Sequence, residues 1–184
     1  MMHVFALIAS DYRKYKKYGG HFLSIVFLTQ GFWAVFQYRI AHFFYTLKIP
    51  IVRYLLLLLS LLWQKLIEIT TGISIPYSAS IGHSLYIGHF GGIIINAKSV
   101  IGNNCNISQG VTIGVSGRET SRGVPVIGDN VYIGANAVVA GKISVGNDCV
   151  IAANSLVVNS FEAGVTLVGV PAKIVNHNTS KGYI

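Results

Sequence analysis

A six-residue repeat of aliphatic side chains runs through the C-terminal part of the chain. A glycine often follows the aliphatic residue, as in Ile101-Gly102. The thirteen positions in this register are Ile75, Ile81, Ile87, Ile95, Ile101, Ile107, Ile113, Ile127, Ile133, Val139, Val145, Ile151 and Val157. A period of six fits neither an α-helix nor a simple alternating strand, whose side chains repeat every ~3.6 and ~2 residues.

The period indicates a solenoid of short strands in which three hexapeptides close one triangular coil. The aliphatic side chain points inward and stacks on its equivalents in the neighbouring coils, while glycine at the next position suits the backbone angles of a corner. Each coil is covered only by the coils above and below it, so stability accumulates by stacking. We therefore predict an all-β, left-handed parallel β-helix over residues 73–175.

Residues 1–72 lack this period and are predicted to form an α-helical N-terminal subdomain. Two helices, Gly31–Leu47 and Ile51–Thr70, are separated by Pro50, and Gly72 follows the second one. At the other end, residues 176–184 are predicted to be a loose C-terminal tail.

The charge of the chain is concentrated in the same N-terminal region. Of the net charge of +8, residues 1–72 contribute +6, because they hold eight Lys or Arg against Asp11 and Glu68. A basic, apolar region suits either anionic lipid or an acidic partner. Peripheral contact of residues 1–72 with the inner face of the cytoplasmic membrane is one expectation. The start, Met1–Ser10, lacks the basic n-region of a signal peptide, which predicts a cytoplasmic protein. Nucleic acid is not an expected partner, because no basic run is interleaved with aromatic residues.

Two interruptions of the repeat are the candidate functional segments. The first holds Gly88-His89-Phe90-Gly91-Gly92, and the second is the polar loop Val115–Gly123. Departures from a regular scaffold are where function concentrates. His89 is the predicted catalytic residue, since a neutral imidazole can take a proton from a hydroxyl as that hydroxyl attacks a thioester.

Neither a metal site nor a disulfide is predicted. Zinc needs three converging ligands, and the repeat region offers only His83 and His89. Cys105 and Cys149 take the small inward position of their hexapeptides in different coils, too far apart to bridge. They are expected to be small core residues in a reducing compartment.

Several segments resemble the serine acetyltransferase branch of the hexapeptide acyltransferases. They are the His89 bulge, the run Ile107–Gly114 and the closing Gly169–Lys173, and Tyr38–Phe44 is similar to the helical domain of that branch. The resemblance implies acetyl-CoA as cosubstrate and a homotrimer, with each active site between two neighbouring β-helices.

The same resemblance implies which residues hold acetyl-CoA. Matched by position, Gly114, Ala135 and Ala153 would line the groove, and Lys173 would meet the nucleotide phosphates. Small residues let the pantetheine arm lie against the backbone of the coils.

The chain departs from that branch at the positions that meet serine. The branch pairs its catalytic His with an Asp one coil earlier, where this chain has Ser74, and places an Asp just before that His, where this chain has Gly88. Its second His and an Arg correspond to Val124 and Gly123. An amino-acid zwitterion would meet no counter-charge at these positions, and unpaired buried charge is costly. This pattern is closer to sugar-modifying relatives such as the colanic acid biosynthesis acetyltransferase.

We therefore expect an acetyl-CoA-dependent O-acetyltransferase with His89 as general base. The expected acceptor is a sugar hydroxyl of a bacterial surface polysaccharide (capsule, exopolysaccharide or O-antigen) or of its lipid-linked precursor. Two alternatives stay open. A serine O-acetyltransferase of cysteine biosynthesis would turn over free L-serine, and a non-catalytic β-helix binding module would bind no acetyl-CoA.

Overall fold

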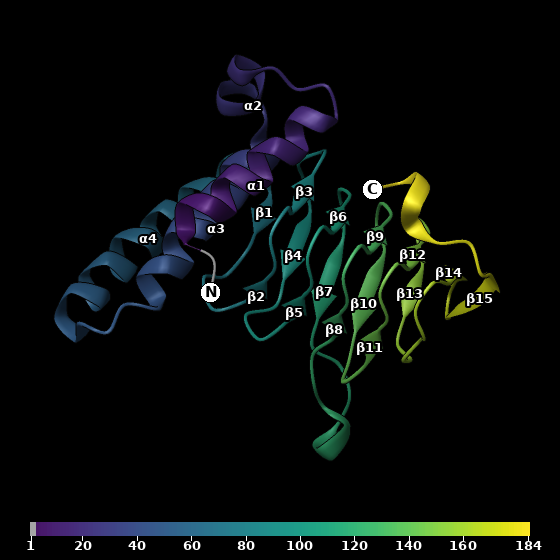
Figure 1. The fold of residues 1–184 in the computed structure, drawn as a ribbon. Helices are drawn as coiled ribbons and strands as arrows, with labels where there is room; N and C mark the ends of the chain where they lie inside the picture. Colours follow the sequence, from purple (N-terminus) through teal and green to yellow (C-terminus); the bar gives the residue numbers. More distant parts are fainter. Residues whose placement is uncertain (1–2) are drawn as a thin grey trace.

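The computed structural model describes residues 3–184 as a group of helices followed by a solenoid of short strands (Figure 1). The helices are α1 (Val4–Lys17), α2 (Phe22–Leu28), α3 (Gln30–Tyr45) and α4 (Pro50–Thr71), and the first two residues of the predicted helical subdomain lie outside the described residues. The strands are β1 (Ile73–Ser74), β2 (Ser80–Ile81), β3 (Tyr86–Ile87), β4 (Ile93–Ile95), β5 (Val100–Ile101), β6 (Asn106–Ile107), β7 (Thr112–Gly114), β8 (Val126–Ile127), β9 (Tyr132–Ile133), β10 (Val138–Ala140), β11 (Ser144–Val145), β12 (Val150–Ile151), β13 (Leu156–Val157), β14 (Thr166–Gly169) and β15 (Ala172–Asn176).

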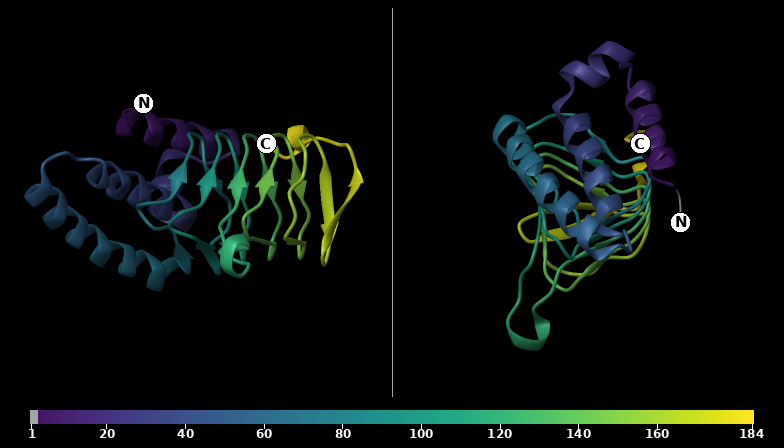
Figure 2. Two further views of the ribbon diagram at one scale, coloured as in Figure 1. Left: turned by 90° about the horizontal axis from the view of Figure 1, so that it is seen from below. Right: turned by 90° about the vertical axis from the view of Figure 1, so that its left-hand side faces the viewer.

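Consecutive strands lie in three different sheets, which form the walls of the solenoid. Wall A has the order β1-β4-β7-β10-β13, wall B the order β2-β5-β8-β11, and wall C the order β3-β6-β9-β12-β14-β15. Every pairing is parallel except the closing hairpin of β14 and β15. Figure 2 shows the coils in line along one axis, with the helices at the end where the first coil begins. The β-helix predicted from the repeat is confirmed.

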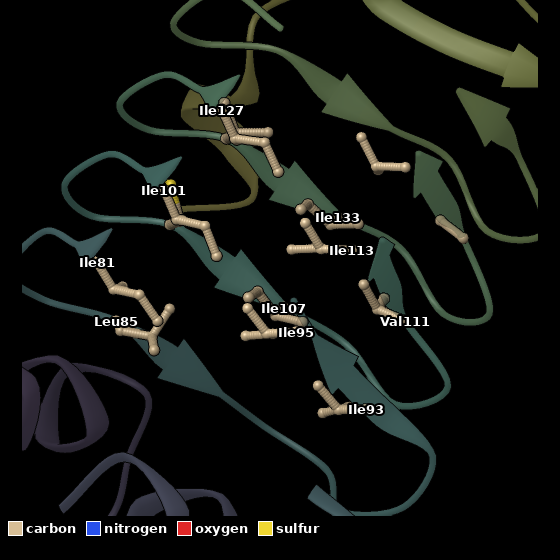
Figure 3. Packing of buried hydrophobic residues seen from close by; sticks show 14 of the residues in the cluster. Ile81, Leu85, Ile93, Ile95, Ile101, Ile107, Val111, Ile113, Ile127 and Ile133 are labelled. Carbon is tan, nitrogen blue, oxygen red and sulfur yellow. The ribbon is translucent and has the colours of Figure 1, made fainter. Parts of the chain in front are cut away.

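The repeated aliphatic residues form the interior of the solenoid. Each of the thirteen is at most 9% exposed. Ile107 of β6 pairs in register with Ile87 on one side and Ile133 on the other, so that equivalent side chains stack along the axis (Figure 3). Cys105 and Cys149 are free and fully buried in the same interior. Burial raises the pKa of the Cys105 thiol to about 11, which keeps it protonated and unreactive.

Short polar side chains make the turns at one set of corners. Asn104, Asn130 and Asp148 have φ angles of 57°, 56° and 59°, in the left-handed region that Asn and Asp tolerate better than other side chains. The Asn104 amide donates to Asn130 Oδ1 at 2.8 Å, and the Asn130 amide donates to Asp148 Oδ1 at 2.9 Å. A polar ladder on the corners therefore accompanies the aliphatic ladder inside.

Helix α3 closes the open end of the first coil through the segment that resembles the helical domain of the serine acetyltransferase branch. The Tyr38 hydroxyl donates to the Ala79 carbonyl at 2.8 Å and accepts from the Ile81 amide at 3.2 Å. Nδ1 of His42 lies 2.7 Å from the Tyr77 carbonyl, which can only accept a hydrogen bond. These side chains supply partners to backbone groups that have no preceding coil to bond.

A buried ion pair fastens α1 and α3 to the same coil. Arg39 contacts both carboxylate oxygens of Asp11, at 2.8 and 3.1 Å, and both side chains are 1% exposed. Arg39 also donates to the carbonyl of Ile81, while Asp11 accepts from the amide of Leu85. The pair is thus surrounded by hydrogen bonds that satisfy its remaining polar atoms, which a buried charge pair requires.

The C-terminal residues pack against the solenoid, so the prediction of a loose tail is wrong. The amide of Ser180 donates to the Asp148 carbonyl at 3.0 Å, and its hydroxyl donates to the Asn130 carbonyl. The ring of Tyr183 lies 4.7 Å from that of Tyr132. These contacts join the C-terminus to backbone and aromatic groups of coils that are distant in sequence. Residues 176–184 have no periodic pattern from which the contacts could be predicted.

Replacing Arg39 by Met should lower the free energy of unfolding by about 3–5 kcal/mol, because Asp11 is left buried without its partner. Urea unfolding followed by far-ultraviolet circular dichroism measures the change. The double variant Asp11→Asn/Arg39→Met removes both charges and should lose less than Arg39→Met alone. A loss below ~1 kcal/mol for Arg39→Met, the range of an exposed ion pair, would contradict this account of the pair.

Candidate active site

His89 lies in a bulge between β3 and β4, at the corner where wall C meets wall A. Gly91 and Gly92 have φ angles of 97° and 67°, which strain any residue with a Cβ. The Gly91 amide donates to the Thr71 carbonyl at the end of α4, and the Gly91 carbonyl accepts from Gly110 in the next coil, both at 2.9 Å. The bulge is therefore held from both sides, while the His89 side chain is exposed.

Two adjoining cavities open beside His89 on the outer surface of wall C. The larger, of about 480 Å³, is lined by His89, Ser108, Gln109, Tyr132, Gly134, Ala135, Val150, Ala152, Ala153, Thr166 and Tyr183. The smaller, of about 190 Å³, is lined by Tyr18, Tyr86, Gly88, His89, Asn106, Ile107, Ser108, Tyr132 and Tyr183. His89, Ser108, Tyr132 and Tyr183 line both cavities, so the two cavities adjoin at the imidazole.

An aromatic cluster that the sequence did not reveal lines these cavities, with Tyr132 and Tyr183 in both and Tyr18 and Tyr86 in the smaller one. Tyr183 from the C-terminus lies against Tyr132, and Tyr18 from the end of α1 stacks on Tyr86 with ring centroids 4.3 Å apart. The Tyr18 hydroxyl donates to the Tyr183 carbonyl at 2.9 Å. Tyr86 and Tyr132 each precede a repeated isoleucine, in the outward position of a wall-C strand. That alternation is the signal that could have found these two.

The structure brings together some of the predicted site residues and not others. Ala135 follows β9 and Ala153 follows β12, so both lie along one edge of wall C in the larger cavity with His89. Gly114 ends β7 at the opposite edge of wall A, and Lys173 is exposed on β15. Neither Gly114 nor Lys173 lines the cavities beside His89 within this chain.

A carboxylate lies beside Ser74, the position at which the serine acetyltransferase branch carries an Asp. Glu68 of α4 accepts from the Ser74 hydroxyl at 2.7 Å and from the Gln64 amide at 2.8 Å. Burial acts to raise the pKa of Glu68, but hydrogen bonds from Lys65, Ser74 and Gln64 outweigh it and lower that pKa. Glu68 is thus ionised at neutral pH in the last turns of the helix whose end binds the His89 bulge.

The other singled-out residues stand apart from these cavities. Nδ1 of His83 lies 3.1 Å from the Ser84 hydroxyl at a different corner of the coil. The second interruption forms an exposed loop that contains a 3-10 turn, Glu119–Ser121, and projects from the solenoid (Figure 1). Within residues 3–184, no three His, Cys, Asp or Glu side chains gather in a way that would hold a metal ion.

Comparison with known proteins identifies the relatives of this arrangement. A family model described as bacterial transferase hexapeptide (six repeats) matches residues 125–159. The chain is 38% identical over 156 residues to the serine acetyltransferase of Staphylococcus xylosus, covering 85% of this chain and 69% of that protein. It is 31% identical over 153 residues to the serine acetyltransferase of Synechococcus elongatus, covering 83% of this chain but only 60% of that longer protein.

Solved structures give the same result. Serine acetyltransferase of Neisseria gonorrhoeae in complex with serine matches with a TM-score of 0.78 and 32% identity, over 94% of this chain and 69% of that one. A serine acetyltransferase in complex with CoA matches with a TM-score of 0.79 and 31% identity, again over 94% and 69%. These similarities confirm the predicted hexapeptide-repeat acyltransferase fold with its left-handed β-helix and N-terminal helices.

The expectation of a sugar acceptor in polysaccharide biosynthesis is wrong. The relatives are serine acetyltransferases at 31–38% identity over most of the chain, and they give no support to a colanic acid or exopolysaccharide enzyme. The expectation rested on acids missing from matched positions in the sequence. Acids missing from matched positions are therefore weak evidence about the acceptor. The position-by-position comparison also did not consider Glu68 of α4, whose carboxylate lies beside Ser74.

Proposed function

The chain belongs to the serine acetyltransferase family of hexapeptide-repeat acyltransferases, and we propose that it transfers an acetyl group from acetyl-CoA to the hydroxyl of L-serine. The observation that carries the proposal is His89, which faces two adjoining cavities from a glycine-held bulge. Two cavities with one base between them suit a reaction in which two substrates meet, because the base must reach the hydroxyl while the thioester lies beside it.

His89 would act as the general base of a direct transfer. The imidazole takes the proton from the serine hydroxyl as its oxygen attacks the thioester carbonyl carbon. The tetrahedral intermediate then collapses, the carbon–sulfur bond breaks, and the sulfur of CoA takes the proton back from the imidazolium. No acyl-enzyme is needed, since the donor is already activated. Ser108 and Gln109 line the larger cavity and are side-chain donors within the described chain that suit the oxyanion.

The larger cavity is the proposed groove for acetyl-CoA. Ala135 and Ala153 follow equivalent strands of wall C and leave the backbone of the coils open to a flexible chain. Gly114 lies at the other edge of wall A, and Lys173 lies on the closing hairpin. We assign these two residues to the same groove in a homotrimer, in which a second copy would present its own wall beside Ala153.

Glu68 is the proposed partner of His89 in place of the aspartate that serine acetyltransferases carry where this chain has Ser74. Its carboxylate accepts a hydrogen bond from the Ser74 hydroxyl. An acid from α4 therefore lies beside the position where the family carries its aspartate. An ionised carboxylate near an imidazole stabilises the imidazolium that forms during proton transfer. In this role Glu68 is a positioning residue, which acts through His89.

Replacing His89 by Ala should lower kcat with L-serine by about 10²–10⁴-fold, because the general base is lost. Release of free CoA, followed with a thiol reagent, measures the rate. His83→Ala removes a histidine of the same solenoid outside the cavities and should keep the wild-type rate. Equal activity of His89→Ala and wild type would exclude the proposed mechanism.

Replacing Ala153 by Leu should raise the KM for acetyl-CoA about tenfold, because a larger side chain fills the groove without touching His89. The KM for serine should change little. Ala163→Leu makes the same change at an exposed residue outside the cavity and serves as the control. An unchanged KM for acetyl-CoA in Ala153→Leu would place the cosubstrate elsewhere.

Replacing Glu68 by Gln should lower kcat about tenfold or more at unchanged KM and move the pH profile of kcat to lower pH. The sign follows because loss of a nearby anion lowers the pKa of an imidazole. Glu162→Gln, at an exposed glutamate, should leave the profile in place. A purely structural role for Glu68 predicts a lower melting temperature with an unmoved pH profile, and that outcome would reject the pairing.

A further inference from the structure

Helix α4 is built with its polar side toward the protein. Its buried stripe consists of Leu57, Ser60, Gln64, Ile67 and Thr71, spaced three or four residues apart on one face. The Ser60 carbonyl accepts from Gln37 of α3 at 3.2 Å. Gln64 reaches the Glu68 carboxylate, as described above. Three of the five side chains packed on the fold are therefore polar, the reverse of an ordinary surface helix.

The side of α4 that faces away from the fold is almost entirely aliphatic. It includes Leu55, Leu58, Leu59, Leu62, Leu66 and Ile69, all more than half exposed. In Figure 2 the helix runs along the outside of the molecule, with no other described element over its outer side. A continuous apolar stripe of this length marks an interaction surface rather than scattered exposed residues.

A second group of exposed apolar residues lies on α2. Phe22, Leu23, Phe27 and Leu28 of α2 are each more than 60% exposed. Between α2 and α4 lies an open hollow of about 590 Å³ to which all four helices contribute, and its lining is apolar and aromatic, with only the Tyr12 hydroxyl and the Trp33 and Trp63 indole N–H groups as polar side-chain atoms. Flexible hydrocarbon chains can fill such a hollow, whereas water inside it would find few hydrogen-bond partners.

The length and attachment of α4 favour a helix that lies in a membrane surface over one that crosses it. By length and composition, α4 is the one helix within residues 3–184 that could span a bilayer, with a mean hydropathy of 1.5 over its most apolar window. However, its inner stripe is packed against α3, and its last residues bond to the His89 bulge and to β4 through the carbonyls of Thr71 and Gly72. A helix bound along its length can present only one face to lipid.

The charge of the subdomain selects the partner. Arg13, Lys16, Lys17, Lys48 and Lys65 are exposed. The acids among residues 3–72 are Asp11, which is buried against Arg39, and Glu68, which is bound to Lys65. Of these cations, Lys17 donates to the Ile184 carbonyl and Lys65 pairs with Glu68. Residues 1–72 still carry a net charge of +6, so two copies of the subdomain repel each other, whereas anionic headgroups attract it.

We propose that the helical subdomain docks on an anionic lipid bilayer, with the outer face of α4 in the interface and α2 beside it. The docking surface is defined by the six α4 residues and four α2 residues named above. It is separate from the His89 cavities, so the inference holds whatever the acceptor of the acetyl group is.

Flotation of the full-length protein with vesicles tests the proposal. Wild type should float with vesicles of phosphatidylglycerol and phosphatidylcholine at low salt, and much less with phosphatidylcholine alone or at high salt. Leu58→Glu/Leu62→Glu should weaken binding to the anionic vesicles at least about tenfold. Val168→Glu/Val170→Glu adds the same charge to exposed valines at the far end of the solenoid and should bind like wild type.

Three outcomes would overturn the proposal. In the first, wild type does not bind anionic vesicles. In the second, both double variants lose binding equally, which would mean that net charge alone determines vesicle binding. If wild type resists extraction at alkaline pH, α4 crosses the membrane instead of lying in it. Sedimentation of the same proteins without lipid tests whether a second copy of the chain covers this face. In that case wild type does not float, and the molecular mass in solution falls in Leu58→Glu/Leu62→Glu but not in the control variant.

Discussion

The first coil of a solenoid has no preceding coil to cover it. In this chain the helices cover it, and the contacts that hold them there also position the strands that lead to the His89 bulge. The Arg39–Asp11 pair joins two helices to the backbone of β2 and to the segment just before β3. Tyr15 of α1 continues the attachment, because its hydroxyl bonds both the amide and the carbonyl of Ile87. The next residues are the bulge with His89. One buried charge pair therefore contributes both to capping the core and to placing the bulge that carries His89.

The site itself follows from the geometry of stacked corners. Glycine at position 92 lets the bulge lie close against the next coil, because a Cβ there would come 3.3 Å from the Gly110 Cα. Equivalent corners in later coils carry Ala135 and Ala153, so the same regularity that builds the core also extends a groove away from His89. The outward residues of wall C then supply its floor. Along these short strands, outward residues that line the cavities alternate with inward residues of the core.

The interior of the solenoid could be predicted from the sequence, because every coil repeats the same inward aliphatic residue at six-residue intervals. The ends of α3 and α4 were also predictable to within two residues, since Pro50 and Gly72 mark them. Tyr18 and Tyr183 were not, because each reaches the cavities from an element without a repeat, through contacts distant in sequence. Glu68 was not either, because only the turn after α4 brings its carboxylate to Ser74. The sugar acceptor was misassigned because a few positions that lack acids were weighed above the similarity of the whole chain, which is 31–38% identical to serine acetyltransferases.

The central claim is that this scaffold acetylates a serine hydroxyl. Mass spectrometry of the products formed by the wild-type protein from acetyl-CoA carrying a ¹³C-labelled acetyl group tests it most directly, with L-serine and bacterial polysaccharide fragments offered together. The account predicts labelled O-acetyl-L-serine, formed in step with free CoA, and no label on the glycans. Label on the glycans with none on serine would contradict it.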